Sequence, residues 1–336
     1  MKNRIILFVF GIFFSCEKDP VSPVGKGNFI NVITIPVNNI QDSRAISGIN
    51  ITNLGSQYTI QERGICWGTA SNPTISDTYV LSNSNNVSIP LYDLIQGKKY
   101  YVRSFIKFNG IYSYGNQQEF TTSLTNSNLL NGLVTYLPLN GDSNDYSSSQ
   151  NTLTGLATKG PGRFGLNNTA YTFNGINNFL TILSPKNLPV NNSTYSISVW
   201  FRAMVWNKEM AIMGYGPSNV SRACNYVKTM TTRGLMHYHW NLDNLFTSSS
   251  FLGQWIHLVI TYDGLNERYY INGQQISSWS RSSNSLIINP NILSIGARVV
   301  SAQNNNISEY FNGSIDEVRI YNRVLNSNEV FVLFNL

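Results

Sequence analysis

Charged side chains are scarce in this sequence of 336 residues. Asp, Glu, Lys and Arg make up 12% of the chain, about half of their usual share in soluble domains. The formal net charge is +6, but the basic residues form no run. Nucleic-acid binders concentrate Lys and Arg on one face or stripe, so we expect no nucleic-acid partner. The hydrophobic share of 42% is enough to bury a core, which excludes a disordered chain.

Cysteine is also scarce, since the chain has only Cys16, Cys66 and Cys224. A disulfide-stabilised scaffold would have more cysteines, in an even number. Cys66 and Cys224 lie among apolar neighbours, and we expect both to be small buried hydrophobes without a bridge. Nucleophile elbows, zinc-protease motifs, phosphate loops and Cys-x-x-Cys pairs are missing as well. These absences argue against an enzyme of the common motif-bearing classes.

One apolar run, at positions 5–14, is too short to span a bilayer comfortably. Lys2 and Arg4 precede it and Ser15-Cys16 follows, which is the layout of a secretory signal peptide. The small-residue-then-Cys ending resembles a bacterial lipobox, although Phe13 and Phe14 depart from the usual pattern. The resemblance implies a signal peptide at 1–15 and a diacylated Cys16 that becomes the mature N-terminus, followed by a tether to residue 27. Cys-Glu-Lys-Asp also resembles an acidic surface-export signal. We therefore expect a lipid anchor in the outer membrane and a surface-exposed protein.

Strand-like runs fill the rest of the chain. Turn residues separate them at a spacing of about ten residues, which is typical of all-β sandwiches. Residues 28–123 form one predicted domain, 124–131 a polar linker, and 132–336 a second domain. Asn272-Gly273 predicts a tight hairpin. The single convincing helix lies at the end, where Asn326 is the predicted N-cap and Glu329 completes a capping box.

The first domain contains Glu-Arg-Gly-Ile-Cys-Trp at 62–67 and Tyr-Tyr-Val-Arg-Ser at 100–104. These stretches resemble the Ig/fibronectin type III-like modules of bacterial surface lipoproteins. The resemblance implies a sandwich that acts as a spacer without chemistry. We expect Trp67 to fill its core and the hydroxyl of Tyr101 to tie a loop to a strand, as a corner tyrosine does.

The second domain carries a longer series of motifs. They are Gly-Leu-Val-Thr-Tyr-Leu-Pro-Leu-Asn-Gly at 132–141, Tyr-Thr-Phe-Asn-Gly at 171–175, Tyr-Ser-Ile-Ser-Val-Trp-Phe at 195–201, Gly-Gln-Trp-Ile-His-Leu-Val at 253–259, and Phe-Asn-Gly-Ser-Ile-Asp-Glu-Val-Arg-Ile-Tyr at 311–321. In this order they resemble the laminin-G-like jelly roll of concanavalin A-like lectins. The resemblance implies a module that binds carbohydrate, for polysaccharide capture or adhesion. Two alternatives are a protein-binding adhesin or structural surface module, and an accessory domain with weak glycan hydrolase activity.

The same resemblance implies a structural calcium ion, since many relatives hold one near the edge of the sandwich. The matching positions are Asp145, Asn177, Asn178 and Asp316. Many relatives have a carboxylate where this chain has the two amides, and the lower ligand charge should weaken binding. The alternative is that Asp145 and Asp316 make hydrogen bonds at turns and strand ends.

A glycan-binding face needs aromatic platforms beside amides. The segment 236–240 alternates two histidines with Tyr238 and Trp240, so one pair must point away from the core if the segment is a strand. Other aromatic residues lie in Asn- and Ser-rich contexts that resemble loops. The alternative is that most of these rings pack in the core. The candidate ligand-binding residues are Trp206, Tyr215, His237, Tyr238, His239, Trp240, Trp279 and Tyr310.

The sequence shows no complete set of residues for catalysis or for binding a transition metal. Glycosidases of this kind need two closely spaced carboxyl groups, and the sequence has no such cluster. Asp316 and Glu317 are adjacent, so we expect their side chains to point to opposite faces of a strand. His237 and His239 have a spacing that suits a metal, but no third ligand is evident. We therefore expect a protein that is not an enzyme.

Overall fold

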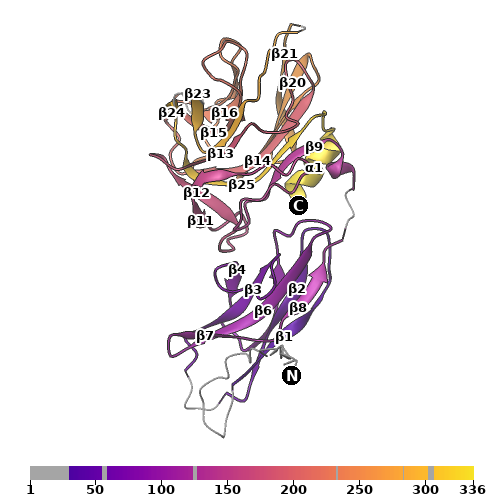
Figure 1. Ribbon diagram of the computed structural model, residues 1–336, viewed down its shortest axis with the longest axis vertical. Coiled ribbons are helices and arrows are strands. Elements are labelled where there is room, and N and C mark those ends of the chain that lie inside the picture. The colour runs from indigo at the N-terminus through magenta and orange to yellow at the C-terminus, as the bar shows by residue number, and fades with distance from the viewer. Residues whose placement is uncertain (1–29, 55–58, 124–126, 232–233, 283, 302–305) are drawn as a thin grey trace, which may run out of the picture.

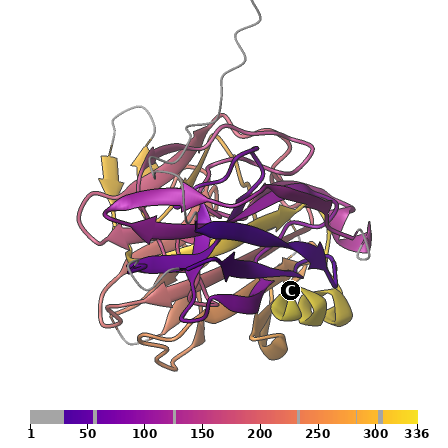
Figure 2. The same ribbon diagram turned by 90° about the horizontal axis from the view of Figure 1, so that it is seen from below.

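The computed structural model describes residues 30–54, 59–123, 127–231, 234–282, 284–301 and 306–336. The predicted signal peptide, Cys16 and the tether lie outside these residues. The described chain is nearly all β, with two sandwiches, one above the other in Figure 1, and a single α-helix (Figures 1 and 2). Within these ranges, no helix is long and apolar enough to cross a membrane.

The first sandwich has a sheet with the order β1–β2–β5 and a sheet with the order β4–β3–β6–β7, in which β8 also pairs with β6. The strands are β1 (Asn31–Asn38), β2 (Ala45–Thr52), β3 (Glu62–Gly68), β4 (Thr78–Leu81), β5 (Asn86–Leu91), β6 (Lys99–Phe108), β7 (Ile111–Tyr114) and β8 (Gln118–Thr121). Trp67 is buried in the core between these sheets, as predicted.

The predicted corner tyrosine is wrong by one residue. Tyr100, not Tyr101, accepts a hydrogen bond at its hydroxyl from the backbone N–H of Ile95, at 3.0 Å. Side chains alternate along a strand, and β6 turns Tyr100 and Val102 into the core. Tyr101 lies on the other face, where the ammonium of Lys99 sits over its ring.

The second sandwich packs two larger sheets, with the orders β10–β13–β22–β15–β16–β17–β18 and β11–β12–β25–β14–β19–β20–β21. Strand β9 also pairs with β25, while β23 and β24 form a separate hairpin. The strands are β9 (Leu133–Leu137), β10 (Thr154–Leu156), β11 (Thr158–Gly160), β12 (Ala170–Asn174), β13 (Phe179–Leu183), β14 (Tyr195–Ala203), β15 (Met210–Tyr215), β16 (Asn225–Thr229), β17 (Leu235–Tyr238), β18 (Asn244–Thr247), β19 (Ile256–Tyr262), β20 (Asn266–Ile271), β21 (Gln274–Ser280), β22 (Ile292–Ile295), β23 (Arg298–Ser301), β24 (Asn306–Ser308) and β25 (Asn312–Tyr321).

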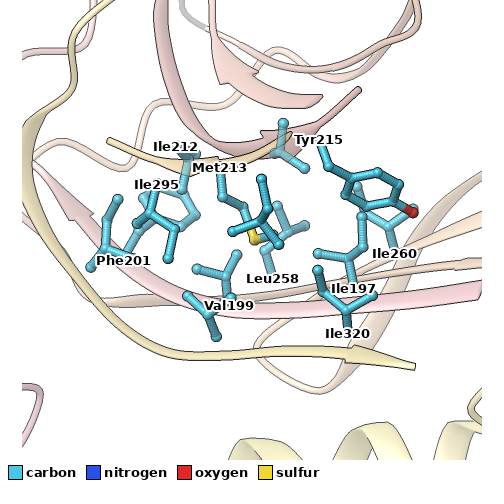
Figure 3. Packing of buried hydrophobic residues seen from close by; sticks show 14 of the residues in the cluster. Ile197, Val199, Phe201, Ile212, Met213, Tyr215, Leu258, Ile260, Ile295 and Ile320 are labelled. Carbon is cyan, nitrogen blue, oxygen red and sulfur yellow. The ribbon is translucent and has the colours of Figure 1, made fainter. Parts of the chain in front are cut away.

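The core of the second sandwich lies between its two sheets. On β14, Ile197, Val199 and Phe201 project to the same side, as the alternation of the sequence predicts (Figure 3). They meet Met213 and Ile295 from the opposite sheet. Each such side chain contributes about 1.5–3 kcal/mol by leaving water. The predicted hairpin is also present, because Asn272 and Gly273 join β20 to β21 with φ of 49° and 79°.

The C-terminal helix α1 (Ser327–Asn335) has the predicted capping box. The side-chain oxygen of Asn326 accepts from the backbone N–H of Glu329 at 2.9 Å, and the Glu329 carboxylate accepts from the N–H of Asn326 at 2.9 Å. Helix α1 covers the outer face of the β14 sheet. There, Phe334 stacks on Trp200 with 5.7 Å between ring centroids.

Arg163 connects the two sandwiches. It lies on the segment between β11 and β12, and its guanidinium contacts Asp93 of the first sandwich at 2.9 Å and Asp316 of β25 at 3.2 Å. All three side chains are buried, with 7% or less of each exposed. Close by, Leu166 of the same segment packs into the core of the first sandwich. The sequence analysis treated the first domain as a spacer and did not predict this contact.

A β-bulge places Asp316 and Glu317 differently from the prediction. The pairing of β14 with β25 shifts register between Ser198 and Trp200, and Glu317 has a φ of 53°. A bulge breaks the alternation of side chains. Asp316 and Glu317 therefore both reach the side of the sheet that faces the first sandwich. The prediction that they point to opposite faces is wrong.

We predict that Arg163→Ala lowers the free energy of unfolding by about 3–5 kcal/mol, because it leaves two buried carboxyl groups without their cation. Denaturant unfolding monitored by tryptophan fluorescence measures this loss. Lys99→Ala is the control, because the pair that Lys99 forms with Glu119 is exposed and stabilises little. A loss no larger than that of the control would contradict an essential role for Arg163.

The environment of His257, on β19, determines part of the pH dependence of folding stability. Its Nε2 lies 2.9 Å from the Ser198 hydroxyl, and its ring stacks on Trp200. Burial, together with the positive charges of Arg319 and Arg163, holds the pKa of His257 well below its usual range. The unfolded chain therefore takes up a proton near pH 6.5 that the folded chain excludes, so folding loses stability as the pH falls below that value.

We expect His257→Gln to weaken this pH dependence, because glutamine does not titrate. Between pH 6.5 and the folded-state pKa, the histidine removes about 1.4 kcal/mol of stability per pH unit. Unfolding curves of both proteins at pH 7.5, 6.0 and 5.0 provide the test. Equal slopes of stability against pH would show that His257 takes up its proton in the folded state.

Candidate functional site

The predicted calcium residues have other partners in the structure. The Asp145 carboxylate accepts hydrogen bonds from the backbone N–H groups of Tyr136, Ser147 and Asn151, at 2.9 to 3.0 Å. Asp316 pairs with Arg163. Asn177 and Asn178 lie in the exposed turn after β12, where Asn174 accepts from their backbone N–H groups. The arrangement matches the alternative of turn and strand-end hydrogen bonds, and calcium binding stays a prediction.

Five of the eight candidate ligand-binding residues are buried: Trp206, Tyr215, His237, Tyr238 and His239. The expectation that Tyr215 lies in a surface loop is wrong, because it belongs to β15 and points into the core. Trp206 packs against Phe201 beneath a surface hollow lined by Met204 and Leu252. Tyr310 is half-buried beside Phe179. Only Trp240 and Trp279 are exposed, at 38% and 50%.

Trp240 is held at the surface by a turn of unusual backbone geometry. It follows β17 and has a φ of 54°, and the next residue, Asn241, has a φ of 68°. A bulky residue in this left-handed region is a true outlier, and such strain gathers at functional positions. Hydrogen bonds maintain the turn, because Asp243 accepts from the N–H of His239 and the Trp240 carbonyl accepts from the N–H of Arg222, both at 2.9 Å.

Trp279 belongs to the same region of the sandwich. It lies on β21, the edge strand of one sheet, and β21 lies against β18, the edge strand of the other. Its cross-strand partner is Glu267. The Glu267 carboxylate lies 3.1 Å from the imidazole of His239, the residue before Trp240. The two exposed tryptophans therefore flank the seam where the sheets meet, and we call Trp240 and Trp279 the tryptophan rim.

A charged aromatic layer adjoins Trp240 on the outer face of β16 and β17. The Tyr238 ring lies edge-on to Trp240 at 6.2 Å, and the ammonium of Lys228 sits over it at 4.4 Å. Lys228 in turn pairs with Glu209 at 2.9 Å and Glu309 at 3.5 Å. Glu309 also pairs with Arg298 at 2.9 Å. The layer therefore combines an aromatic ring with paired charges beside Trp240.

Behind the rim, between the sheets, lies a buried polar cluster of His237, His239 and Glu267, which we call the histidine–glutamate cluster. The three ligand-type atoms lie within 4.8 Å of one another, and all three residues are fully buried. Burial lowers the pKa of His237 to about 4, although the Glu267 charge acts in the opposite direction. Burial acts to raise the pKa of Glu267, but the adjacent imidazoles hold that pKa well below its usual range.

The sequence analysis found the two histidines of this cluster but missed Glu267. The available signal was weak: Glu267 alternates with the core residue Tyr269, but it stands between the polar residues Asn266 and Arg268. It comes from the opposite sheet and lies 28 residues after His239. Only the packing of the two sheets brings these residues together.

Residues 174–331 match the family described as the concanavalin A-like lectin/glucanases superfamily, in its Laminin_G_3 form. Together with the two packed antiparallel sheets, this match shows that the second domain is a concanavalin A-like jelly roll. The chain has no match among the curated proteins.

Solved structures with a similar fold include domain 4 of an extracellular GH43 arabinanase from Geobacillus stearothermophilus, in complex with arabinotriose. It is 20% identical, the alignment covers 60% of this chain and 97% of that one, and the TM-score is 0.46. Another is a structure of botulinum neurotoxin type C, a toxin whose cell entry depends on interaction with two ganglioside molecules. That structure is 15% identical, with 62% of this chain and 52% of that chain covered and a TM-score of 0.49. At these values the likeness adds nothing to the family match.

Proposed function

We propose that this chain is a surface lipoprotein whose second domain binds carbohydrate at the tryptophan rim. The observation that carries the proposal is Trp240, a large apolar side chain held in water by a strained and hydrogen-bonded turn. A position chosen for stability alone would favour Gly or Asn at this φ. Ligand binding by the indole ring would explain why a tryptophan occupies this strained backbone position.

The chemistry around the rim suits a sugar. The apolar C–H face of a pyranose packs on an indole, and its hydroxyl groups need donors and acceptors beside that ring. Asn241 and Asp243 follow Trp240 and are exposed, and Ser278 and Ser280 surround Trp279 on β21. The partner is therefore a polysaccharide or glycoconjugate, bound along the seam for capture or adhesion.

The remaining parts of the chain fit a display role. The first sandwich, which resembles a fibronectin type III-like module, would hold the second away from the membrane, and Arg163 fixes the two together. Cys16 would carry the acyl chains that attach the protein to the outer membrane, with the protein on the cell surface. The proposal assigns no catalytic step to the chain.

We predict that Trp240→Asn and Trp279→Ala each reduce glycan affinity by at least about tenfold, since losing one well-packed aromatic contact costs more than 1.4 kcal/mol. The full-length chain is first screened on a glycan array, and the best ligand is then titrated by calorimetry. Trp240→Asn should keep or raise thermal stability, because asparagine tolerates the left-handed conformation.

Phe331→Ala is the matched control, because Phe331 is an exposed aromatic residue of α1, 56% exposed and away from the rim. Glycan affinity that survives both rim substitutions would remove the rim from the proposal. A protein-binding adhesin would instead bind host or matrix protein without competition from any free sugar. Release of reducing ends from polysaccharides would indicate the hydrolase alternative.

Calcium binding by Asp145, Asn177, Asn178 and Asp316 remains part of the proposal to be tested. Melting curves with millimolar Ca²⁺ and with a calcium chelator compare the two states. An unchanged midpoint would show that these residues serve only the hydrogen bonds and the ion pair that they make in the structure.

A further inference from the structure

Three acceptor atoms of the histidine–glutamate cluster converge on one point. Glu267 Oε1 lies 3.1 Å from His239 Nε2 and 3.3 Å from His237 Nδ1. His237 belongs to β17 of one sheet and His239 follows the end of that strand, whereas Glu267 comes from β20 in the other sheet. The cluster therefore bridges the two sheets of the sandwich, directly behind the tryptophan rim.

The outward nitrogens of both imidazoles have partners that determine their protonation. His239 Nδ1 lies 2.7 Å from the backbone carbonyl oxygen of Cys224, which can only accept, so this nitrogen carries the proton. His237 Nε2 lies 2.7 Å from Asn225 Oδ1, and the Asn225 amide group donates to the Tyr215 hydroxyl. His237 Nε2 is therefore also a donor.

In neutral imidazoles, the inward nitrogens are then lone-pair acceptors that face a carboxylate oxygen. The Tyr269 hydroxyl lies 3.5 Å from His237 Nδ1, but it donates its proton to the other oxygen of Glu267. The two inward nitrogens and Oε1 therefore need a cation or a proton between them, because hydrogen bonds require a donor. A histidine that donates its outer N–H to a carbonyl or amide oxygen has the arrangement that supports a metal ligand. Both histidines have it.

Glu267 directs Oε1 at the imidazoles, and the Tyr195 hydroxyl donates to the same oxygen at 3.4 Å. The other oxygen, Oε2, accepts from the Tyr269 hydroxyl and from Arg281 at 2.8 Å. Arg281 Nε also lies 2.8 Å from Oε1, but its N–H makes no well-aligned hydrogen bond there. Arg281 is further anchored to the Leu242 carbonyl at 2.8 Å, so the carboxylate is held in place from behind.

We propose that His237 Nδ1, His239 Nε2 and Glu267 Oε1 form a binding site for a zinc-like transition-metal dication. Two imidazole nitrogens and one carboxylate oxygen are a known protein ligand set for zinc. In a tetrahedral site with bonds of about 2.0–2.1 Å, neighbouring ligand atoms are about 3.3 Å apart. The carboxylate oxygen lies 3.1 and 3.3 Å from the two nitrogens, so these two separations need little adjustment, and all three atoms lie within 4.8 Å of one another.

The site would have a structural role. A metal at this point ties β17 to β20 where the edges of the two sheets meet, and it fixes His239 immediately before the strained turn of Trp240. Because the site is buried, the ion would be taken up as the domain folds, and its binding would add to the stability of the fold. This inference stands independently of glycan binding.

The first test uses the full-length chain, freed of metal by a strong chelator and then titrated with zinc chloride. We expect one zinc per chain by elemental analysis and a higher melting midpoint with zinc than with chelator. Cobalt(II) in place of zinc should give the intense visible absorption of tetrahedral coordination. No zinc uptake, no shift of the midpoint, or only a weak octahedral cobalt spectrum would each overturn the proposal in favour of a cluster held by hydrogen bonds alone.

The second test assigns the site to these residues. His237→Gln and His239→Gln should each weaken zinc binding by roughly 100-fold. His257→Gln is the matched control, because it removes the other buried histidine of the same domain, and it should leave zinc binding unchanged. Retention of zinc by both cluster variants would overturn the assignment. If a cluster variant does not fold, the cobalt spectrum of the unaltered chain decides the question.

Discussion

In the second domain, two sheets bury one face against each other. Strands such as β14 and β19 are covered on both sides, so each polar group that they carry needs a partner within the protein. Most inward positions avoid that requirement by being apolar. Among the exceptions are His237, His239 and Glu267, each of which has polar partners within the sandwich.

The same requirement explains the junction between the sandwiches. The outer face of the β14 sheet carries Asp316, and burying it against the first sandwich would leave a carboxylate without water. Arg163 solves this problem and at the same time holds Asp93 of the other domain. The two sandwiches are thereby joined by a buried ion cluster.

Local patterns were sufficient for much of the fold. Asn272-Gly273 predicted a hairpin and Asn326 with Glu329 predicted a capped helix, and both are confirmed. The alternation of residues 195–201 predicted a half-buried strand; the strand is present, but it is covered on both faces. These features depend on neighbours within a few residues, so the chain encodes them directly. Tyr101 was placed wrongly because a shift of one residue along a strand moves a side chain to the other face of the sheet. The Asp316–Glu317 pair was placed wrongly because a β-bulge breaks the alternation of side chains.

Residue patterns were enough to predict the class of fold and to point to the aromatic residues and histidines around position 238. Which of these residues meet water, and which meet each other, depends on how the two sheets pack. Five candidate aromatic and histidine residues became buried, while Trp240 and Trp279 remained exposed at one seam. Glu267 joined the two histidines because the opposite sheet carries it there. The spacing of residues in the sequence predicts contacts within one strand or turn. The packing of two sheets brings together residues whose separation in the sequence follows no regular pattern.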